Sequence, residues 1–249
     1  MPLISILTVT RNAGHHLPNL ITDYRNAKRQ DCEWIVIDGA STDGTCNLLK
    51  SSSDIIQSIS EPDAGIYNAM NKGIQLAKGE YIVFFGADDR LFPDALEKIR
   101  SFILSHDSRP DVIVAGVKIG NKMRIGYKPG LHWWGPGACV TGHSVGMLVQ
   151  RNVMIKEGGF SLHYPQCADG LLIKRLMAGN YSIVQSEVIM GSFGSRGVSN
   201  TNIARGLCEG YLIQRETERS QILQLSIFLL RILKNLPRLI SKREIKGPN

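Results

Sequence analysis

Short runs of apolar residues alternate with segments of helical spacing over the first 106 residues. The apolar runs lie at residues 3–10, 33–38, 55–60 and 80–86. Residues 17–28 and 66–78 have the apolar spacing of helices, and Gly79 is expected to end the helix over residues 66–78. A short helix is also expected after Asp43-Gly44. Strands that are apolar on both faces and alternate with helices are typical of a mostly parallel sheet covered on two sides. The pattern therefore predicts an α/β fold, doubly wound up to about residue 106.

The regular alternation of predicted strands and helices ends at about residue 106. Further strands are predicted at residues 111–116, 123–127, 145–150 and 182–190, and helices at 170–178 and 203–219. Residues 128–137 are rich in glycine, proline and tryptophan and are expected to form a long irregular loop, a kind of segment that often binds ligands. We therefore expect one domain over residues 1–220, in which residues 107–220 add a smaller mixed sheet to the half formed by residues 1–106.

The last segment, residues 221–249, combines an apolar helix with basic residues. Residues 222–236 are apolar at all but five positions, and Pro237 is expected to break the helix. This segment carries six Lys and Arg against one acidic residue, so +5 of the formal net charge of +7 belongs to it. A basic amphipathic helix is typical of an anchor on an anionic membrane leaflet, and the alternative is a helix packed on the globular body. The nearly neutral body argues against nucleic acid as a partner.

Cysteine usage and the first residues bear on location. The five cysteines are widely spaced and include no C-x-x-C pair, which fits reduced thiols better than a zinc site or a disulfide framework. No signal peptide is visible at the N-terminus, and no apolar run reaches about 18 residues. We therefore expect a cytoplasmic protein that is peripheral on the inner face of the cytoplasmic membrane.

Acidic residues follow several of the predicted strands. Asp38, Asp63 and the pair Asp88-Asp89 come at or after strand ends, where open parallel sheets bind their ligands. No glycine-rich dinucleotide or P-loop motif accompanies them. Carboxylates need a divalent cation to bind phosphates, and Mg²⁺ and Mn²⁺ prefer oxygen ligands, so the pair is a candidate diphosphate-metal site. The alternatives are a helix start for Asp88-Asp89 and a turn residue for Asp38.

Four motifs together carry a resemblance to a known family. The chain contains SILTVTRN, EWIVIDGASTDGT, SEPDAGIYNAMNKGIQLAKGEYIVFFGADD and CADGLLIKRL, in that order. They resemble the family 2 inverting glycosyltransferases of the GT-A fold, more narrowly bacterial enzymes of colanic-acid, capsule and O-antigen assembly, from about Leu3 to Ser199. The resemblance implies transfer of a sugar from a nucleoside diphosphate donor, with UDP expected first and GDP or dTDP as alternatives. It also implies a Mn²⁺ or Mg²⁺ cofactor and a glycan acceptor, often on a polyprenyl diphosphate.

The resemblance also implies a role for each matching residue. On the donor side, Thr8, Val9 and Arg11 would lie against the nucleotide, and Asp38 would contact the base or ribose. Asp63 and Lys72 would flank the second donor loop, and Asp88 would lie next to the sugar nucleotide. Asp89 would bind the metal directly, and Asp169 would be the base that takes the acceptor proton, with a helix cap as its alternative. Many relatives have a second acid at Gly39 and an arginine at Met70, so these two positions leave the nucleotide base open.

Four further residues are candidates for the acceptor side. His143 lies where relatives have a His-Gln pair, although Ser144 follows it here, and a buried structural histidine is the alternative. Arg196, in a Gly/Ser-rich segment, would bind a phosphate or belong to a solvated loop. Trp133 and Trp134 would stack on a sugar ring, lie at a lipid interface or plug the core.

Three rival functions remain open. A glycosyltransferase with a free or protein-bound acceptor would not need the basic segment at a membrane. A nucleotidyltransferase would be expected to carry a glycine-rich first loop with a basic residue, and Thr10-Arg11-Asn12-Ala13-Gly14 is a poor match. A non-catalytic nucleotide-sugar-binding module would keep the fold and need neither Asp89 nor Asp169.

Overall fold

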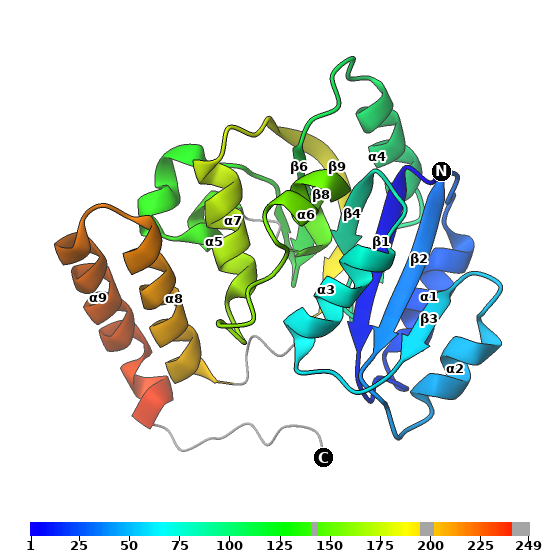
Figure 1. Ribbon diagram of the computed structural model, residues 1–249, viewed down its shortest axis with the longest axis horizontal. Helices are drawn as coiled ribbons and strands as arrows, with labels where there is room; N and C mark the ends of the chain where they lie inside the picture. The colour runs from blue at the N-terminus through cyan, green and yellow to red at the C-terminus, as the bar shows by residue number, and fades with distance from the viewer. Residues whose placement is uncertain (141–143, 195–201, 241–249) are drawn as a thin grey trace.

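A computed structural model describes residues 1–140, 144–194 and 202–240 of the protein (Figure 1). Its strands are β1 (Ile4–Thr10), β2 (Cys32–Asp38), β3 (Gln57–Ser60), β4 (Tyr81–Phe84), β5 (Arg90–Leu91), β6 (Val112–Ile119), β7 (Lys122–Arg124), β8 (Met147–Gln150) and β9 (Ile183–Phe193). Its α-helices are α1 (Leu17–Asn26), α2 (Thr45–Ser51), α3 (Ile66–Leu76), α4 (Ala95–Leu104), α5 (Pro136–Cys139), α6 (Arg151–Lys156), α7 (Ala168–Ala178), α8 (Ile203–Thr217) and α9 (Gln221–Ile240). Two short 3₁₀ helices are η1 (Pro129–Trp134) and η2 (Ser144–Gly146).

One sheet runs through the whole molecule. Over the described residues its strands lie in the order β3-β2-β1-β4-β8-β6-β9-β5, and β7 pairs with β6. Strands β1 to β4 pair in parallel, β8 is antiparallel to both β4 and β6, and β9 is parallel to β6. Most strands therefore point the same way, which confirms the expected α/β class. The smaller mixed sheet expected beyond residue 106 is the far half of this same sheet.

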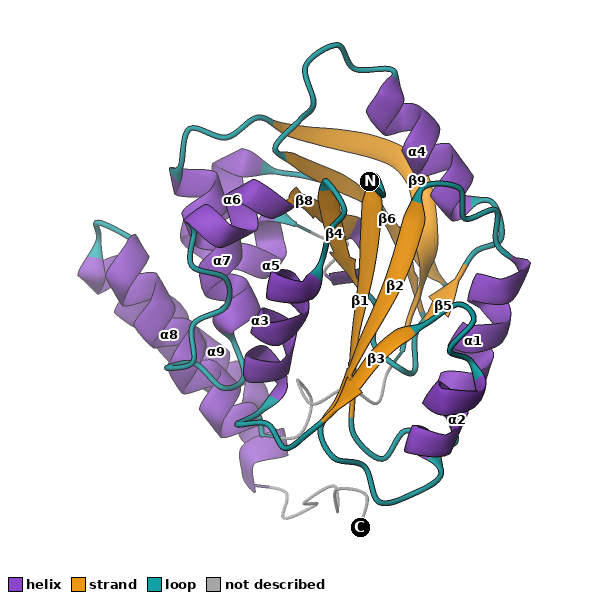
Figure 2. Ribbon diagram, turned by 45° about the vertical axis from the view of Figure 1, so that its right-hand side comes forward, coloured by secondary structure: helices purple, strands orange, loops and turns teal. Residues whose placement is uncertain are grey.

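Helices cover both faces of the sheet, and the burial pattern of the strands explains why. Alternate residues of the buried strands contact different layers: Ile6 and Val36 pack with residues of α1, α2 and α4, while Leu7 and Ile35 pack with residues of α3, α6 and α7. Figure 2 shows these two helix layers on opposite sides of the strands. Because both faces are covered, the central strands are apolar throughout, as the sequence pattern predicts.

Gly79 does not end a helix in the way expected from the sequence. Helix α3 already ends at Leu76, and Gly79 has no left-handed backbone. A Cβ at position 79 would lie 2.6 Å from the backbone nitrogen of Ser5, so only glycine allows this close approach to β1. The Gly79 N–H donates to both the Ser5 hydroxyl (2.8 Å) and Glu33 Oε1 (3.0 Å). The expected helix-cap role of Gly79 is wrong, and close packing takes its place.

Residues 128–137 are more regular than expected. They contain η1 and the start of α5, and each helix has a proline in its first turn, where the missing N–H costs no hydrogen bond. Glycine and proline in this segment therefore mark two helix starts rather than an irregular loop. The sequence interpretation also misses the short helix α6, which follows β8 directly.

Helix α9 packs on α8 and continues through Pro237. The rings of Tyr211 and Phe228 stack with centroids 4.5 Å apart, and Gln224 and Ile227 are buried. The predicted break at Pro237 is wrong, because α9 ends only at Ile240. A proline frees a carbonyl in the preceding turn, and near the exposed end of a helix water satisfies that group.

Much of the apolar surface of α9 faces outward. Nine large apolar residues of this helix are exposed, and we call them the apolar face of α9: Ile222, Leu223, Leu225, Leu229, Leu230, Leu233, Leu236, Leu239 and Ile240. Over the described part of the chain, every helix falls short of the length and apolar character that crossing a bilayer requires. Figure 1 shows α8 and α9 at the end of the molecule opposite β3.

Candidate functional site

The carboxyl ends of the parallel strands bring most of the predicted residues to one edge of the sheet. Strands β1, β2 and β3 end in register at this edge, and β4 points the same way. Helix α3 starts there after β3, and β9, which has the same direction as β4, ends there as well. Loops from both halves of the sheet therefore meet at this edge, as ligand sites of open α/β sheets do.

Asp38, the last residue of β2, is fully buried and holds the turn after it. Its carboxylate accepts hydrogen bonds from the Ser41 N–H (2.9 Å), the Ser41 hydroxyl and the Ser60 hydroxyl (2.6 Å). The contacts with Ser41 are those expected of a turn residue, which was the alternative interpretation of Asp38. Asp38 therefore fixes the shape of the loop after β2, and its role at the base or ribose stays a prediction.

Gly39 leaves room for the side chains of two neighbouring loops. A Cβ at position 39 would lie 2.5 Å from Asp63 Oδ2 and 3.5 Å from Arg11 Cδ. Asp63 is held in this place because its Oδ1 accepts the Gly65 N–H at 2.8 Å. The Asp63 carboxylate therefore occupies the space that a side chain on residue 39 would need, and Arg11 lies against the same spot.

Lys72 fastens the loop that carries Asp63. Its ammonium group forms an ion pair with Glu61 at 2.6 Å and donates to the Pro62 carbonyl at 3.2 Å. Lys72 lies on α3, the helix that follows this loop, and it is only partly buried. Asp63 thus lies on this loop and Lys72 binds the loop from α3, while the role of both beside the donor stays a prediction.

The end of β1 carries three residues of interest. Thr8 is fully buried, and its hydroxyl accepts a hydrogen bond from Trp34 Nε1 at 3.0 Å; its place against the nucleotide stays a prediction. Val9 is partly buried against the α3 side of the core. Thr10, which the sequence interpretation did not select, is buried and its hydroxyl has no hydrogen-bond partner within the described residues. A buried hydroxyl in that state is uncommon in proteins, which makes Thr10 a further candidate.

Asp88 and Asp89 converge over a glycine. A Cβ at Gly86 would lie 3.1 Å from Asp89 Oδ2 and 3.2 Å from Asp88 Oδ1. Asp89 is buried, and it accepts the N–H groups of Gly86 (2.5 Å) and Gly194 (2.7 Å), so it ties the end of β4 to the end of β9. Asp88 is partly buried beside Gly194. Since α4 begins only at Ala95, the alternative of a helix start for this pair is wrong.

The environment of the pair suits a divalent cation. Burial raises the pKa of Asp89 to about 7, the two backbone N–H groups oppose this rise, and the charge of Asp88 adds to it. Over the described residues there is no cluster of three or more metal-ligating side chains. Two carboxylates with hard oxygen donors match Mg²⁺ and Mn²⁺, which are commonly held by one or two carboxylates together with substrate phosphates.

Asp169 reaches the same edge from the other half of the molecule. It lies in the first turn of α7 after the N-cap residue Cys167, so it is not the helix cap itself. Its Oδ1 accepts the Tyr67 hydroxyl at 3.0 Å, and Tyr67 lies in the first turn of α3. Burial, and then the charge of Asp169, raise the pKa of Tyr67 above its ordinary range, so the phenol stays a hydrogen-bond donor.

The partnership of Tyr67 and Asp169 is not visible in the sequence. The two residues are 102 positions apart, and one lies in the donor motif while the other lies in the acceptor motif. The one available signal was an aromatic residue at the start of a helix that follows a strand end.

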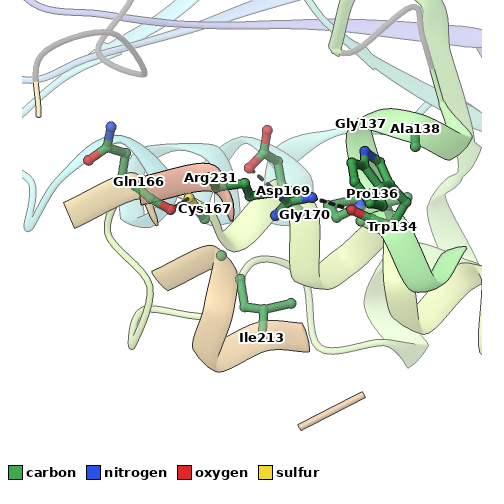
Figure 3. A pocket seen from close by; sticks show the side chains of 14 residues that line it. Trp134, Pro136, Gly137, Ala138, Gln166, Cys167, Asp169, Gly170, Ile213 and Arg231 are labelled. Carbon is green, nitrogen blue, oxygen red and sulfur yellow. Dashed lines mark hydrogen bonds between the residues drawn. The ribbon is translucent and has the colours of Figure 1, made fainter. Parts of the chain in front are cut away.

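A cavity of about 470 Å³ adjoins Asp169. Figure 3 shows Asp169 in its wall together with Gly170, Pro136, Trp134 and Arg231 of helix α9. Trp133 and Trp134 are 37% and 43% exposed, which shows that neither is a core plug. Their rings meet edge to face with centroids 5.5 Å apart. Arg231 was not selected from the sequence, where it reads as one of several basic residues in the last segment.

Two predicted residues, His143 and Arg196, lie outside the described residues.

The comparisons with known proteins agree on the class of protein. The model of the family described as Glycosyl transferase family 2 matches residues 5–160. The PGL/p-HBAD biosynthesis glycosyltransferase Rv2957 of Mycobacterium tuberculosis is 32% identical over 120 residues, which are 46% of each chain. TuaG of Bacillus subtilis, provisionally named a teichuronic acid biosynthesis glycosyltransferase, is 31% identical over 107 residues, 41% of this chain and 42% of its own. The matched part thus spans less than half of these curated relatives.

Solved structures share the fold over nearly the whole chain. Residues 1–349 of S. aureus TarS in complex with UDP-GlcNAc align with a TM-score of 0.71 and 17% identity, covering 98% of this chain and 77% of that one. The mannosyltransferase PcManGT from Pyrobaculum calidifontis, crystallised with GDP-Man and Mn²⁺, aligns with a TM-score of 0.66 and 15% identity, covering 95% and 75%. The family match covers more than half of the chain and the architecture is that of GT-A enzymes: the protein belongs to glycosyl transferase family 2.

Proposed function

We propose that the protein is an inverting glycosyltransferase of surface polysaccharide assembly, which moves a sugar from a nucleoside diphosphate donor to a glycan acceptor. UDP is the first candidate for the nucleotide, with GDP and dTDP as alternatives. One observation carries the proposal: the Asp88-Asp89 pair and the Tyr67-held Asp169 come from opposite halves of the chain and lie at one edge of the sheet. The names and bound nucleotides of the relatives support this class of reaction.

The donor loops and the carboxylate pair divide the binding of the donor. Arg11, Asp63 and the loop that Lys72 fastens face the nucleotide, and Asp88 and Asp89 would hold a divalent cation. Such a cation would stabilise the negative charge that develops on the leaving diphosphate. The two neighbouring carboxylates, of which Asp89 is buried, would provide the negative charge that holds this cation.

Asp169 has the role of base in this proposal. In a single displacement the acceptor hydroxyl attacks the anomeric carbon, the bond to the diphosphate oxygen breaks on the opposite face, and the hydroxyl proton passes to the Asp169 carboxylate. Tyr67 donates to Oδ1 of Asp169 and so fixes the orientation of the carboxylate. A base positioned in this way contributes about 10²–10⁴-fold to such a reaction.

The apolar face of α9 supports an acceptor at a membrane surface. Three basic residues, Arg231, Lys234 and Arg238, lie on the same helix, and the sequence continues with Lys242, Arg243 and Lys246. An exposed apolar helix face with flanking basic residues is suited to the headgroup region of an anionic leaflet. We therefore propose a polyprenyl-diphosphate-linked glycan as the acceptor, with the enzyme peripheral on the inner leaflet.

A thermal-shift screen of nucleotide sugars tests the donor half of this proposal. A ligand that binds only the native state raises the melting temperature with its concentration. We expect one UDP-, GDP- or dTDP-sugar to raise the melting temperature in the presence of Mn²⁺ or Mg²⁺, and EDTA to remove most of the shift. If no nucleotide sugar shifts the protein with either metal, the proposed donor class is wrong.

A further inference from the structure

The cavity beside Asp169 is built by four segments that are far apart in the sequence. Its walls come from the η1–α5 segment, the start of α7, one face of α8 and the middle of α9. Most of the lining is apolar or glycine, with Trp134, Ile173 and Ile213 as the largest apolar members. The cavity is therefore not a continuation of the Asp88-Asp89 pair, whose residues are absent from its walls. It can take an apolar group of moderate size next to the carboxylate of Asp169.

Glycines on α8 keep this cavity open. Gly206 and Gly210 lie one turn apart on the helix and both line the cavity. A Cβ at Gly210 would meet nothing within 4 Å, so packing does not require glycine there. Glycine inside a helix costs about 1 kcal/mol relative to alanine. The space in front of Gly210 is thus free for a ligand rather than filled by the protein.

Arg231 brings a positive charge into this apolar wall. It is partly buried, its Nη2 donates to the Trp134 carbonyl, and its guanidinium carbon lies 5.9 Å from the Trp134 ring centre. Within the described residues no carboxylate forms an ion pair with it. Gly135 has a positive φ of 124°, and a Cβ there would lie 2.9 Å from Nη2, so glycine is needed for this approach.

The Arg231 guanidinium has N–H donors beyond the one that the Trp134 carbonyl accepts. Arginine keeps its charge in proteins and carries five N–H donors in a planar fork that matches phosphate oxygens. A partly buried cation without an acidic partner is costly to hold unless an anion joins it. The other charged side chain of the lining, Asp169, is already bound by Tyr67. An anionic group that enters this cavity therefore has Arg231 as its counter-ion.

We propose that this cavity is the acceptor subsite and that Arg231 binds a phosphate of the acceptor next to an apolar chain. The proposal rests on the proposed function and deepens it, because it assigns to α9 a part in the site as well as at the membrane. The phosphate can belong to a lipid-linked acceptor or to a water-soluble glycosyl phosphate. The apolar lining and the adjoining apolar face of α9 favour the lipid-linked form.

Binding of simple amphiphiles tests the subsite without knowledge of the acceptor. Decyl phosphate, inorganic phosphate and decyl glucoside, below their micelle concentrations, would be titrated while tryptophan fluorescence is followed, since Trp134 lines the cavity. We expect decyl phosphate to bind most tightly, inorganic phosphate to bind weakly, and decyl glucoside to bind at least tenfold more weakly than decyl phosphate. Equal binding of the two decyl compounds would overturn the anionic character of the subsite. Inorganic phosphate as tight as decyl phosphate would instead assign it to water-soluble phosphates.

Two variants and a control locate the binding. Arg231→Gln should weaken decyl phosphate at least tenfold, and Gly210→Leu, which fills the cavity from a position with free space, should abolish binding. Arg215→Gln removes an exposed charge from α8 that does not line the cavity, and it should leave binding unchanged. Unchanged decyl phosphate binding in both Arg231→Gln and Gly210→Leu would refute the proposal. Nucleotide binding measured on the same samples reports on the donor site separately, so failure of the subsite and failure of the proposed function are distinguishable.

Discussion

At the scale of single residues, the absence of a side chain at Gly39 allows the Asp63 carboxylate to lie against the backbone of residue 39. Asp63 Oδ2 comes within 2.5 Å of the Cβ position of residue 39, and Arg11 packs against the same spot. The resemblance implies only that a second acid, present in many relatives, is absent at Gly39. The structure adds that Asp63, held by the Gly65 N–H, takes that space, which one-dimensional spacing cannot reveal.

Gly39→Ala should therefore weaken nucleotide binding without unfolding the protein. The new methyl group pushes the Asp63 carboxylate aside, and we expect about tenfold weaker UDP binding in calorimetric titrations with Mn²⁺, equivalent to about 1.4 kcal/mol. Gly44→Ala is the matched control, because a Cβ at Gly44 meets nothing within 4 Å. Equal UDP affinity in both variants would show that Asp63 does not shape the nucleotide site.

Tyr67→Phe tests the positioning of Asp169. The variant keeps the ring, which stacks on Phe160 with centroids 5.3 Å apart, and removes only the hydroxyl, whose two acceptors at 3.0 Å are Asp169 Oδ1 and the Gln166 carbonyl. A hydrogen bond to a charged group contributes about 1.5–3 kcal/mol, so we expect kcat to fall about tenfold or more. Donor affinity and acceptor KM should stay within about twofold of wild type. A rise in acceptor KM at unchanged kcat would assign Tyr67 to acceptor binding instead.

At the scale of elements, a buried polar group joins the tryptophan segment to two helices. Lys174 of α7 is 3% exposed, forms an ion pair with Glu218 and donates to the His132 carbonyl at 3.0 Å, while His132 Nδ1 contacts Glu218 at 2.9 Å. Burial alone would raise the pKa of Glu218, but the hydrogen bonds from Lys174 and His132 outweigh it and lower that pKa. Helices η1, α7 and α8 are therefore fixed to one another next to the cavity.

Glu218→Gln should destabilise the protein by about 3–5 kcal/mol, because it leaves the Lys174 ammonium buried without its partner. Glu97→Gln, which breaks the exposed pair with Lys28, should change stability far less, because water screens an exposed ion pair. Urea unfolding at pH 7 measures both. Similar losses in the two variants would mean that the Lys174–Glu218 pair has no special role in stability.

The same pair predicts how stability depends on pH. Since the folded pKa of Glu218 lies below its ordinary value of 4.5, its contribution is present above pH 4.5 and is lost as the pH falls through the folded pKa. Urea midpoints between pH 7 and pH 3 should fall in the wild type, and Glu218→Gln should lack part of this fall. Parallel curves for the two proteins would contradict the assignment.

The elements themselves were largely predictable, because their apolar spacing is local information. Where the prediction failed, long-range packing decided: Gly79 serves the approach to β1, and Pro237 lies inside a helix supported by α8. The contacts of Asp38 and Thr8 show the same limit for the site, since strand position places both residues along the chain but does not reveal their partners Ser60 and Trp34 on neighbouring strands. Tyr67 and Arg231 were missed because their partners lie on other helices.

At the scale of the whole molecule, the positive charge and the apolar surface gather on one helix. Much of the net charge of +7 lies in the last 29 residues, and α9 carries the exposed apolar face next to the cavity beside Asp169. One helix thus serves both as a wall of the cavity and as the surface suited to a membrane. This arrangement would place the acceptor subsite at the lipid headgroups.

Substitutions in the apolar face of α9 test this arrangement. Leu229→Ser, Leu230→Ser and Leu233→Ser together expose no core residue, because all three side chains are already more than half exposed. We expect sedimentation with vesicles of mixed neutral and anionic phospholipid to drop severalfold, and UDP binding to stay the same. A triple variant that sediments like the wild type would rule out α9 as the membrane-binding surface.

The most direct test of the central claim is sugar transfer by Asp169→Asn. The measurement is transfer of radiolabelled sugar from the best nucleotide sugar of the thermal-shift screen into membranes of the source organism, with Asp94→Asn as the control. Asp94 is the residue before helix α4, and its exposed side chain forms an ion pair with Lys98 at 3.8 Å. We predict that Asp169→Asn loses about 10²-fold or more in transfer and keeps its nucleotide affinity, while Asp94→Asn matches the wild type. Near-normal transfer by Asp169→Asn would contradict the account.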